Sequence, residues 1–427
     1  MDSSDTPGLT RHVAEFVVAT RAGDLPTEVV ELGKTHILDA LGLSLSGMAT
    51  AAGEILSRYV ADQGCTGGGA SVLGTGLKTI PRFAAFANGT CMHMDDFDDT
   101  NPPAVAGRNG GVHATVSALA GALAIAERDG RSGQDLLTAV MVGTEVTAKL
   151  NHASSPRHYE SGFHATGTLN GFGTAAAVAR LLGADAAAVQ RSIGLAASQS
   201  SGLRENFGTM TKPFHAGHAA ECGLVAADLV TRGFTAAENV LEAPRGFFSA
   251  TGGAWDPAPI IGRMGNPWAI ADPGTWLKPY PSGALNHPAM TLLSDLIAEH
   301  DIEPAQVKKV TVTTNRRFLN VLLHGQPSDG LQAKFSLPFC LAILILRRRA
   351  GLAEYTDEVV ALPEVKEMIG RIEHVAYDDA KPDYTSVTTF LDIELADGRR
   401  IGGRADFGRG NPKRRMTFNE VAEKARG

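Results

Sequence analysis

The chain has 427 residues, which is enough for about two domains with separate hydrophobic cores. Its 39 Lys and Arg residues against 46 Asp and Glu residues give a formal net charge of −7, which does not suit a nucleic-acid-binding surface. Four cysteines without a C-x-x-C pair argue against a disulfide framework or a zinc ribbon, and no apolar run reaches the roughly 20 residues of a membrane span.

The first part of the chain is predicted to form one large all-helical domain, residues 1–265. Residues 1–11 lack the basic and apolar stretches of a secretory signal, so we expect a cytoplasmic protein. Beyond them, apolar residues recur at helical spacing as far as about Ala254, with many Ala and Gly that allow close helix packing. Residues 114–127 are apolar on nearly every side, which is typical of a central helix, and Ser132 and Asp185 are predicted helix N-caps.

A glycine-rich run, residues 64–76, interrupts this helical pattern. It lacks the G-K-[ST] ending of a phosphate-binding loop and the G-x-G-x-x-G of a dinucleotide fold. We therefore expect no nucleotide cofactor. H-E-x-x-H and G-x-S-x-G are also missing, so the signatures of a zinc hydrolase and a serine esterase are absent.

Prolines concentrated between Trp255 and Pro281 mark the predicted junction to a smaller α+β lid domain, residues 266–407. The tail, residues 408–427, is weakly helical near its end and is expected to pack back onto the large domain. The fold class is therefore mainly α. Within the lid we predict a strand, a helix and a hairpin around Asp397-Gly398, at residues 307–314, 331–348, and 386–395 with 399–405.

The densest polar cluster is Asp95-Asp96-Phe97-Asp98-Asp99, directly after a predicted apolar helix at residues 83–91. An exposed acidic turn would relieve the repulsion between the carboxylates, whereas a position at the end of a buried helix favours a functional site. The D-D-x-D-D pattern is also the magnesium-binding pattern of helical terpenoid synthases. That interpretation is disfavoured, because no second metal motif follows and aromatic residues make up only 6% of the chain.

Three further candidates lie in short motifs in which small residues or a proline stand next to the polar side chain. His164 lies in Gly-Phe-His-Ala-Thr-Gly, where small residues leave room for a ligand, although a single histidine is more often structural. Lys212 and Lys278 each precede a proline, which disfavours the helical region and holds each lysine in an extended turn. Lysines fixed in this way suit anion binding, and solvated surface charges are the alternative.

Taken together, these motifs resemble the MmgE/PrpD superfamily of 2-methylcitrate dehydratases, cis-aconitate decarboxylases and iminodisuccinate epimerases. The resemblance extends over nearly the whole chain. A position that often holds arginine in this family is His218 here, and the lid tyrosine of the decarboxylases has no clear match near residues 321–324. The motifs that carry the resemblance are residues 87–89, His93, 96–100, 162–167, 205–213, 278–281, 287–288 and 333–336.

The resemblance implies a large helical domain with an α+β lid, a homodimer, and a site without metal or organic cofactor. We expect neither a nucleic acid nor a membrane as partner. The catalytic residues it implies are Asp96, His113, His164, Lys212 and Lys278, with Thr100, the two lysines and His287 as substrate contacts.

The implied activity is that of a metal-independent lyase that dehydrates or decarboxylates a small di- or tricarboxylate, such as 2-methylcitrate or cis-aconitate. In this hypothesis His164 takes a proton next to a carboxylate and His113 is the acid, while Lys212 and Lys278 stabilise the developing charge. Asp96 orients a basic partner. An epimerase of an iminodisuccinate-like dicarboxylate that uses the same site, and a non-catalytic binding protein, are the alternatives.

Overall fold

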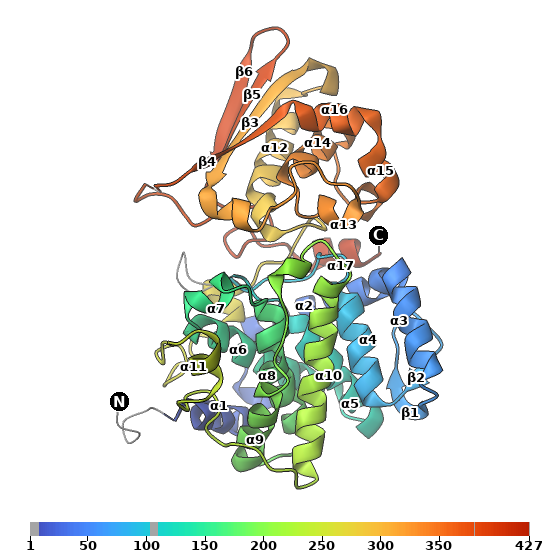
Figure 1. Ribbon diagram of the computed structural model, residues 1–427, viewed down its shortest axis with the longest axis vertical. Coiled ribbons are helices and arrows are strands. Elements are labelled where there is room, and N and C mark those ends of the chain that lie inside the picture. The colour runs from blue at the N-terminus through green and yellow to red at the C-terminus, as the bar shows by residue number, and fades with distance from the viewer. Residues whose placement is uncertain (1–7, 103–109, 380, 427) are drawn as a thin grey trace.

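The computed structural model describes residues 8–102, 110–379 and 381–426. Figure 1 shows two stacked lobes, a helical lobe formed by the first part of the chain and a small lobe that contains a sheet. This arrangement confirms the predicted fold class. In the described residues before the small lobe, the helices of eight or more residues are α1 (Leu9–Ala19), α2 (Thr27–Met48), α3 (Ala51–Asp62), α4 (Pro81–His93), α5 (Ala114–Asp129), α6 (Gly133–Ala153), α8 (Ala165–Leu181), α9 (Ala186–Ala197) and α10 (Thr211–Thr231).

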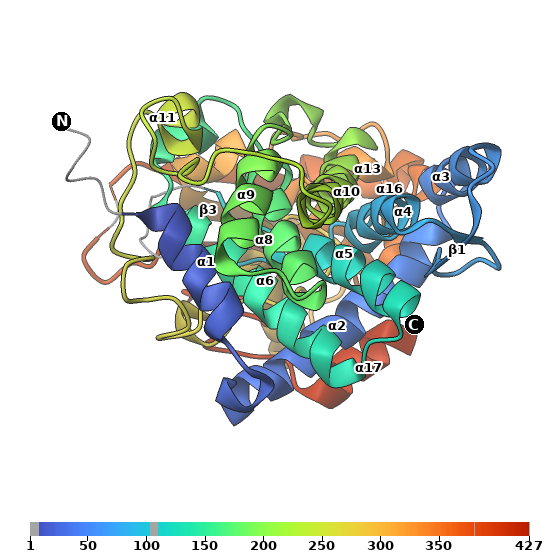
Figure 2. The same ribbon diagram turned by 90° about the horizontal axis from the view of Figure 1, so that it is seen from below.

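Helix α8 lies at the centre of the helical lobe, as the view from below shows (Figure 2). It packs against α5, α6, α9 and α10, and nearly all of its residues are buried. The N-caps are confirmed, since the Ser132 and Asp185 side chains accept hydrogen bonds from the backbone at the start of α6 and α9. Glycines bring α6 and α8 into backbone contact, because a Cβ on Gly173 would overlap Gly143 O and Thr147 Oγ1.

The helical lobe also contains a short two-stranded ribbon, which the prediction of an all-helical domain did not include. Strand β1 (Thr66–Ser71) pairs antiparallel with β2 (Lys78–Thr79). Both strands lie in or next to the glycine-rich run. Gly67, Gly69 and Gly74 adopt positive φ angles of 83°, 77° and 77°, which side chains rarely tolerate, and this explains the glycine content of the run.

The small lobe is a four-stranded sheet in the order β4-β3-β5-β6, with β3 parallel to β4 and antiparallel to β5. The predicted strand and hairpin are confirmed as β3 (Val307–Asn315), β5 (Thr389–Leu395) and β6 (Arg400–Ala405), whereas β4 (Ile372–Tyr377) was not predicted. The predicted helix at residues 331–348 is divided into α13 (Gly330–Ala333) and α14 (Leu337–Arg347), because Ser336 caps a new helix. Helices α12 (His287–His300), α14 and α16 (Pro363–Gly370) pack against this sheet or one another.

The two lobes have separate cores, and the connection between them is irregular. Side chains as far as Ala271 pack on the core of the helical lobe, while Trp276 and Tyr280 pack on the core of the small lobe. After β6 the chain returns to the helical lobe. There α17 (Phe418–Arg426) lies along α2, and its Lys424 forms a buried ion pair with Asp39 (Figures 1 and 2).

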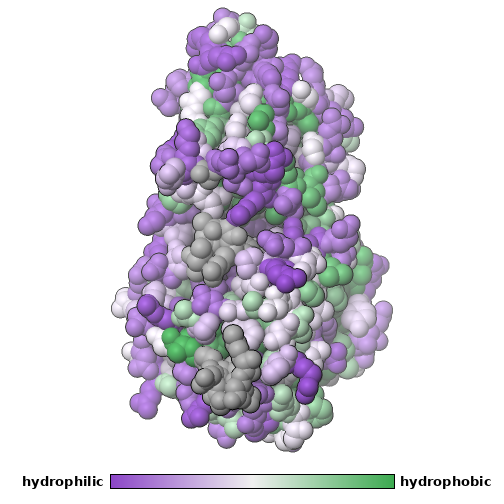
Figure 3. Space-filling view, turned by 60° about the vertical axis from the view of Figure 1, so that its left-hand side comes forward, coloured by the Kyte–Doolittle hydropathy of each residue, from purple (hydrophilic) through white to green (hydrophobic). Residues whose placement is uncertain are grey.

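The surface carries mixed polarity over both lobes. Figure 3 shows hydrophilic residues spread over the visible face, with hydrophobic residues in small patches. Within the described parts of the chain, no helix is long and apolar enough to cross a membrane.

The close contact between α6 and α8 generates a stability prediction. Gly173→Ala should lower the free energy of unfolding by about 1–3 kcal/mol, because the added methyl group must separate two packed helices. Gly171→Ala is the matched control on the same helix, since its Cβ would lie 3.7 Å from the nearest atom, Ala219 O. This variant should be neutral or up to about 1 kcal/mol more stable. Urea denaturation followed by circular dichroism compares the two, and equal midpoints would contradict the packing argument.

Candidate functional site

The acidic turn after α4 lies inside the protein. Asp95, Asp96, Asp98 and Asp99 are 7%, 4%, 1% and 2% exposed. The interpretation as an exposed acidic turn is therefore wrong. Lys212 and Lys278, at 4% and 1% exposure, are also buried, so neither is a solvated surface charge. A buried charge needs a partner, and the partners define the site.

Each of the four carboxylates contacts a different set of basic or hydroxyl groups. The carboxylates therefore do not converge on one point as a diphosphate-bound magnesium cluster requires, and the terpenoid-synthase interpretation is wrong. The contacts are Asp95 with Ser46 and Lys334, Asp96 with Lys212 and Lys278, Asp98 with His93 and His113, and Asp99 with His36 and Thr115.

Asp96 is the centre of the strongest charge cluster. Its Oδ1 accepts hydrogen bonds from Lys212 Nζ and Lys278 Nζ, each at 2.8 Å. Burial opposes ionisation of Asp96, but the two ammonium charges outweigh it and hold the pKa of this carboxyl well below its usual range. Asp96 Oδ2 has no hydrogen-bond partner among the described residues. With φ of 49°, Asp96 also adopts the left-handed conformation, which is uncommon outside glycine and frequent at functional sites.

His93, the last residue of α4, connects Asp98 to Lys212. Its Nδ1 lies 2.8 Å from Asp98 Oδ1, and Lys212 Nζ donates to its Nε2 at 2.9 Å. An ammonium group cannot accept, so the ring is neutral with its proton on Nδ1. Burial lowers the pKa of His93 to about 3, although Asp98 opposes this shift, and the neutral form agrees with these contacts. His93 belongs to one of the sequence motifs, but no role was predicted for it.

His113 and His164 stand at the N-termini of α5 and α8, and Lys212 at the N-terminus of α10. His113 Nδ1 lies 2.7 Å from Asp99 O, and His164 Nδ1 lies 2.9 Å from His215 Nδ1. Burial, with the nearby charge of Lys212, lowers the pKa of His164 well below its usual value, which leaves this ring as a neutral base. Helix N-termini carry partial positive charge, so three of them at one place favour an anionic ligand.

The small lobe closes the site from the other side. Phe335 stacks on Phe207 of the helical lobe with ring centroids 5.6 Å apart, and Lys212 Nζ lies about equally close to both rings. Lys334 Nζ reaches Asp95 Oδ1 at 3.2 Å. Between the lobes remains a cavity of about 10 Å³, the space of about one water molecule. It is lined by His93, Met94, Asp96, Gly208, Thr209, Lys212, Pro213, Leu331, Lys334 and Phe335.

Three predicted substrate contacts, Thr100, Lys278 and His287, do not line this cavity, and neither do His113 and His164. Thr100 forms a backbone bridge to Trp276, which ties the acidic turn to the segment that carries Lys278. His287 begins α12, where its Nε2 contacts Ser282 O at 3.2 Å. The structure therefore brings Asp96, His113, Lys212 and Lys278 together around His93. The His164 ring stacks on the His93 ring, with centroids 6.2 Å apart.

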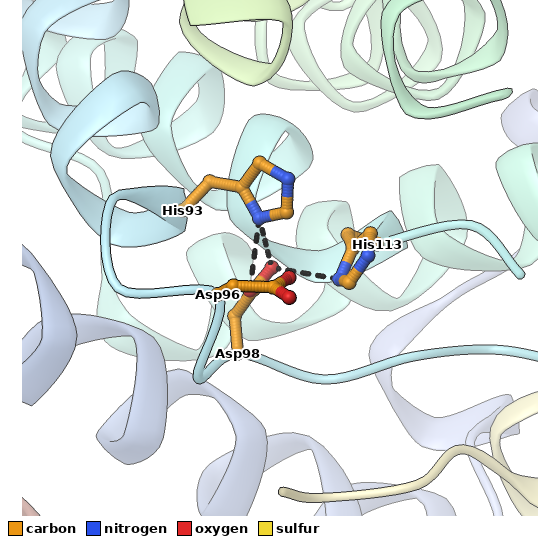
Figure 4. A group of neighbouring side chains, drawn as sticks. All are labelled: His93, Asp96, Asp98 and His113. Atoms are coloured by element: carbon orange, nitrogen blue, oxygen red, sulfur yellow. Dashed lines mark hydrogen bonds and ion pairs between the residues drawn. The ribbon is translucent and has the colours of Figure 1, made fainter. Parts of the chain in front are cut away.

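Four of these groups form a donor set that a cation could use. Ligand atoms of His93, Asp96, Asp98 and His113 lie within 4.8 Å of one another, and Figure 4 shows both histidines directed at Asp98. However, Lys212 contacts both His93 Nε2 and Asp96 Oδ1, and Lys278 contacts Asp96 as well. Both ammonium groups lie directly beside this donor set, and a divalent cation placed there would be repelled by both of them.

A larger cavity of about 340 Å³ lies elsewhere, next to Tyr280, α12 and residues 409–420. Three arginines line it, but each already forms an ion pair. The pairs are Arg409 with Glu420, Arg414 with Asp295, and Arg415 with Glu28. Among the described residues, this cavity therefore offers no unpaired charge to an anionic ligand, and we assign the chemistry to the smaller cavity.

Burial of His287 predicts a pH dependence of stability. Burial, with the charge of Lys278, lowers the pKa of His287 from its usual 6.5 to about 3. Between these values the unfolded chain binds the proton more readily, so stability falls as the pH falls through this window. When the pH falls from 6.5 to 5.5, the free energy of unfolding of the unsubstituted protein should decrease by about 1 kcal/mol more than that of His287→Gln. Urea denaturation at both pH values measures this, with the exposed His300→Gln as control, and equal losses would contradict the assignment.

Comparison with known proteins places the whole chain in one family. The MmgE/PrpD N-terminal domain matches residues 11–259, and the MmgE/PrpD C-terminal domain matches residues 280–427. The cis-aconitate decarboxylase of Homo sapiens is 26% identical over 425 residues, which cover 98% of this chain and 87% of that protein. The cis-aconitate decarboxylases of Mus musculus and Aspergillus terreus are each 24% identical and cover 98% and 94% of this chain, and 86% and 85% of those proteins. With both of its domains matched, the chain belongs to the MmgE/PrpD family.

Proposed function

We propose that this protein is a metal-independent lyase that removes carbon dioxide from a small unsaturated tricarboxylate of the cis-aconitate type. The observation that carries the proposal is the pair of buried ammonium groups, Lys212 and Lys278, held on one carboxylate oxygen of Asp96. The names of the similar proteins favour loss of carbon dioxide over loss of water. Dehydration of a 2-methylcitrate-like substrate uses the same groups and is the alternative outcome of the first test below.

The charge of the site suits a substrate with several carboxylates. Lys212 and Lys334 line the cavity, and Lys278 contacts Asp96 in its wall. The N-terminus of α10 also contributes to the lining. In the proposed complex, a substrate carboxylate takes the place of Asp96 at one or both lysines. Such fixed donors stabilise developing negative charge without having to reorient during the reaction.

In the proposed decarboxylation, the bond between carbon and the leaving carboxylate breaks, and its electron pair moves into the neighbouring unsaturated carboxylate. The lysines stabilise this anion. A proton then adds to the carbanion, which balances the reaction. His113 is the proposed acid, and the neutral His164 is the proposed base in the dehydration alternative, where a proton must first be removed.

The proposed independence from metal rests on the lysines. The ammonium groups already supply positive charge where a metal ion would act as a Lewis acid. Substrate binding also requires the site to open, because a cavity of about 10 Å³ cannot hold a tricarboxylate. In this proposal Leu331, Lys334 and Phe335 of the small lobe move away from the helical lobe to admit substrate.

The reaction is tested by proton NMR in deuterated buffer containing a chelator. The purified protein is added separately to cis-aconitate, 2-methylcitrate, citrate and iminodisuccinate. We expect conversion of cis-aconitate with loss of carbon dioxide and incorporation of one deuteron. Release of water from 2-methylcitrate would instead select the dehydratase, and exchange without loss of a group would select the epimerase. No turnover of any of these substrates by folded protein would contradict the proposal.

The role of the lysines is tested by Lys212→Ala. Loss of one preorganised donor should reduce kcat/KM by about 10²- to 10³-fold. Lys366→Ala removes an exposed lysine of the small lobe and is the control, with no expected change. Both variants are checked for folding by thermal denaturation. A folded Lys212→Ala protein with undiminished turnover would refute the central part of the proposal.

A second pair of variants distinguishes the roles of the two histidines. His164→Gln and His113→Gln should each reduce turnover by about 10²- to 10⁴-fold if the ring transfers a proton. In a decarboxylase His113→Gln should be the more damaging variant, because the carbanion needs an acid. A larger effect of His164→Gln, together with lost solvent exchange into unreacted substrate, would support proton abstraction as the first step.

A further inference from the structure

Helix α10 carries a second group of metal-ligating side chains, separate from the acidic turn. His218, Glu221 and Cys222 occupy positions i, i+3 and i+4, so their side chains lie on one helix face. Their ligand atoms lie within 4.8 Å of one another. The group shares no residue with the candidate active site, and nothing in the proposed reaction uses it.

Two distances within this group are close to those between neighbouring ligands of one tetrahedral ion. His218 Nδ1 lies 3.2 Å from Glu221 Oε1 and 3.7 Å from Cys222 Sγ, which also lies 3.5 Å from Nε2 of the same ring. Around a zinc ion with bonds of about 2.0–2.1 Å to nitrogen and oxygen and about 2.3 Å to sulfur, neighbouring ligand atoms are about 3.3–3.6 Å apart. His218 Nδ1 and Glu221 Oε1 are therefore close to the separation of two ligands, and the Cys222 side chain would have to turn toward Nδ1 to place all three atoms on one ion.

Two of the ligands are each held in position by a neighbouring side chain, as ligands commonly are in metal sites. The His218 ring stacks on Phe214, with centroids 5.4 Å apart and planes 9° apart. Arg82 donates to Glu221 Oε2, which leaves Oε1 directed at His218. Cys222 is itself 5% exposed.

We propose that His218 Nδ1, Glu221 Oε1 and Cys222 Sγ bind a zinc ion, with water as the fourth ligand. Imidazole, carboxylate and thiolate together suit a borderline divalent ion such as Zn²⁺ better than Mg²⁺ or Ca²⁺. The thiol loses its proton to solvent on binding, and thiolate and carboxylate then balance the two positive charges. Side-chain exposures of 26% for His218 and 14% for Glu221 leave a path for the ion and its water. Arg82 is 53% exposed, so solvent screens its repulsion.

Cobalt is the spectroscopic probe, because a thiolate bound to Co²⁺ gives a near-ultraviolet charge-transfer band and a tetrahedral ion gives intense visible bands. The full-length protein is reduced, freed of metal with a chelator, and titrated with Co²⁺ under anaerobic conditions. We expect both sets of bands to saturate at one equivalent and to disappear when Zn²⁺ is added. Cobalt bound at His93, Asp96, Asp98 and His113 would lack the charge-transfer band, so the active-site donors cannot imitate the result.

The variants Cys222→Ser, His218→Ala and Glu221→Gln identify the ligands. Cys222→Ser should abolish the charge-transfer band, and the other two should weaken Zn²⁺ binding more than about tenfold. Cys65→Ser, at the most exposed of the four cysteines, is the control and should bind as the unsubstituted protein does. Alkylation with peptide mapping gives a second readout, in which Zn²⁺ protects Cys222. A missing band at one equivalent, a band lost in Cys65→Ser, or a Cys222 that Zn²⁺ does not protect would overturn the proposal.

Discussion

Four carboxylates buried in one turn are the constraint on which the rest of this structure depends. Each loses its hydration on folding, and a buried carboxylate without a partner would be strongly destabilising. The partners that compensate come from many parts of the chain. Ser46 and His36 belong to α2, His93 to α4, Lys212 to α10, Lys278 to the segment between the lobes, and Lys334 to the small lobe. The acidic turn therefore requires both lobes to be folded and in contact.

The same constraint explains how lysines can stay charged and fixed inside a protein. Burial lowers the pKa of Lys212, and the Asp96 carboxylate opposes this shift. Asp96 Oδ1 holds both lysines by direct contact, so their positions are set before any ligand arrives. In the proposed reaction the substrate carboxylate enters a site that is already organised for negative charge, and little reorganisation is needed.

The sequence predicted those parts of the fold that local chemistry determines. Helix caps and tight turns depend only on residues near them in the chain, and the caps Ser132 and Asp185 and the turn at Asp397-Gly398 were identified from the sequence. The ribbon at residues 66–79 was missed because glycine has no strand preference, and the helix at residues 331–348 was drawn too long because its apolar run hides the Ser336 cap. Asp96, Lys212 and Lys278 stand in recognisable motifs. In contrast, the pairs Asp99 with His36 and Asp95 with Lys334 join residues 63 and 239 positions apart, and a single sequence carries no signal for such contacts.

The contact between α17 and the acidic turn has a consequence for synthesis. Lys424 Nζ donates to Phe97 O at 2.7 Å and lies 3.8 Å from the centre of the Phe97 ring, a contact across 327 positions of the chain. During translation the helices around the turn leave the ribosome long before Lys424 does. Until α17 emerges, the nascent helical lobe therefore lacks the contact that Lys424 makes with its acidic turn.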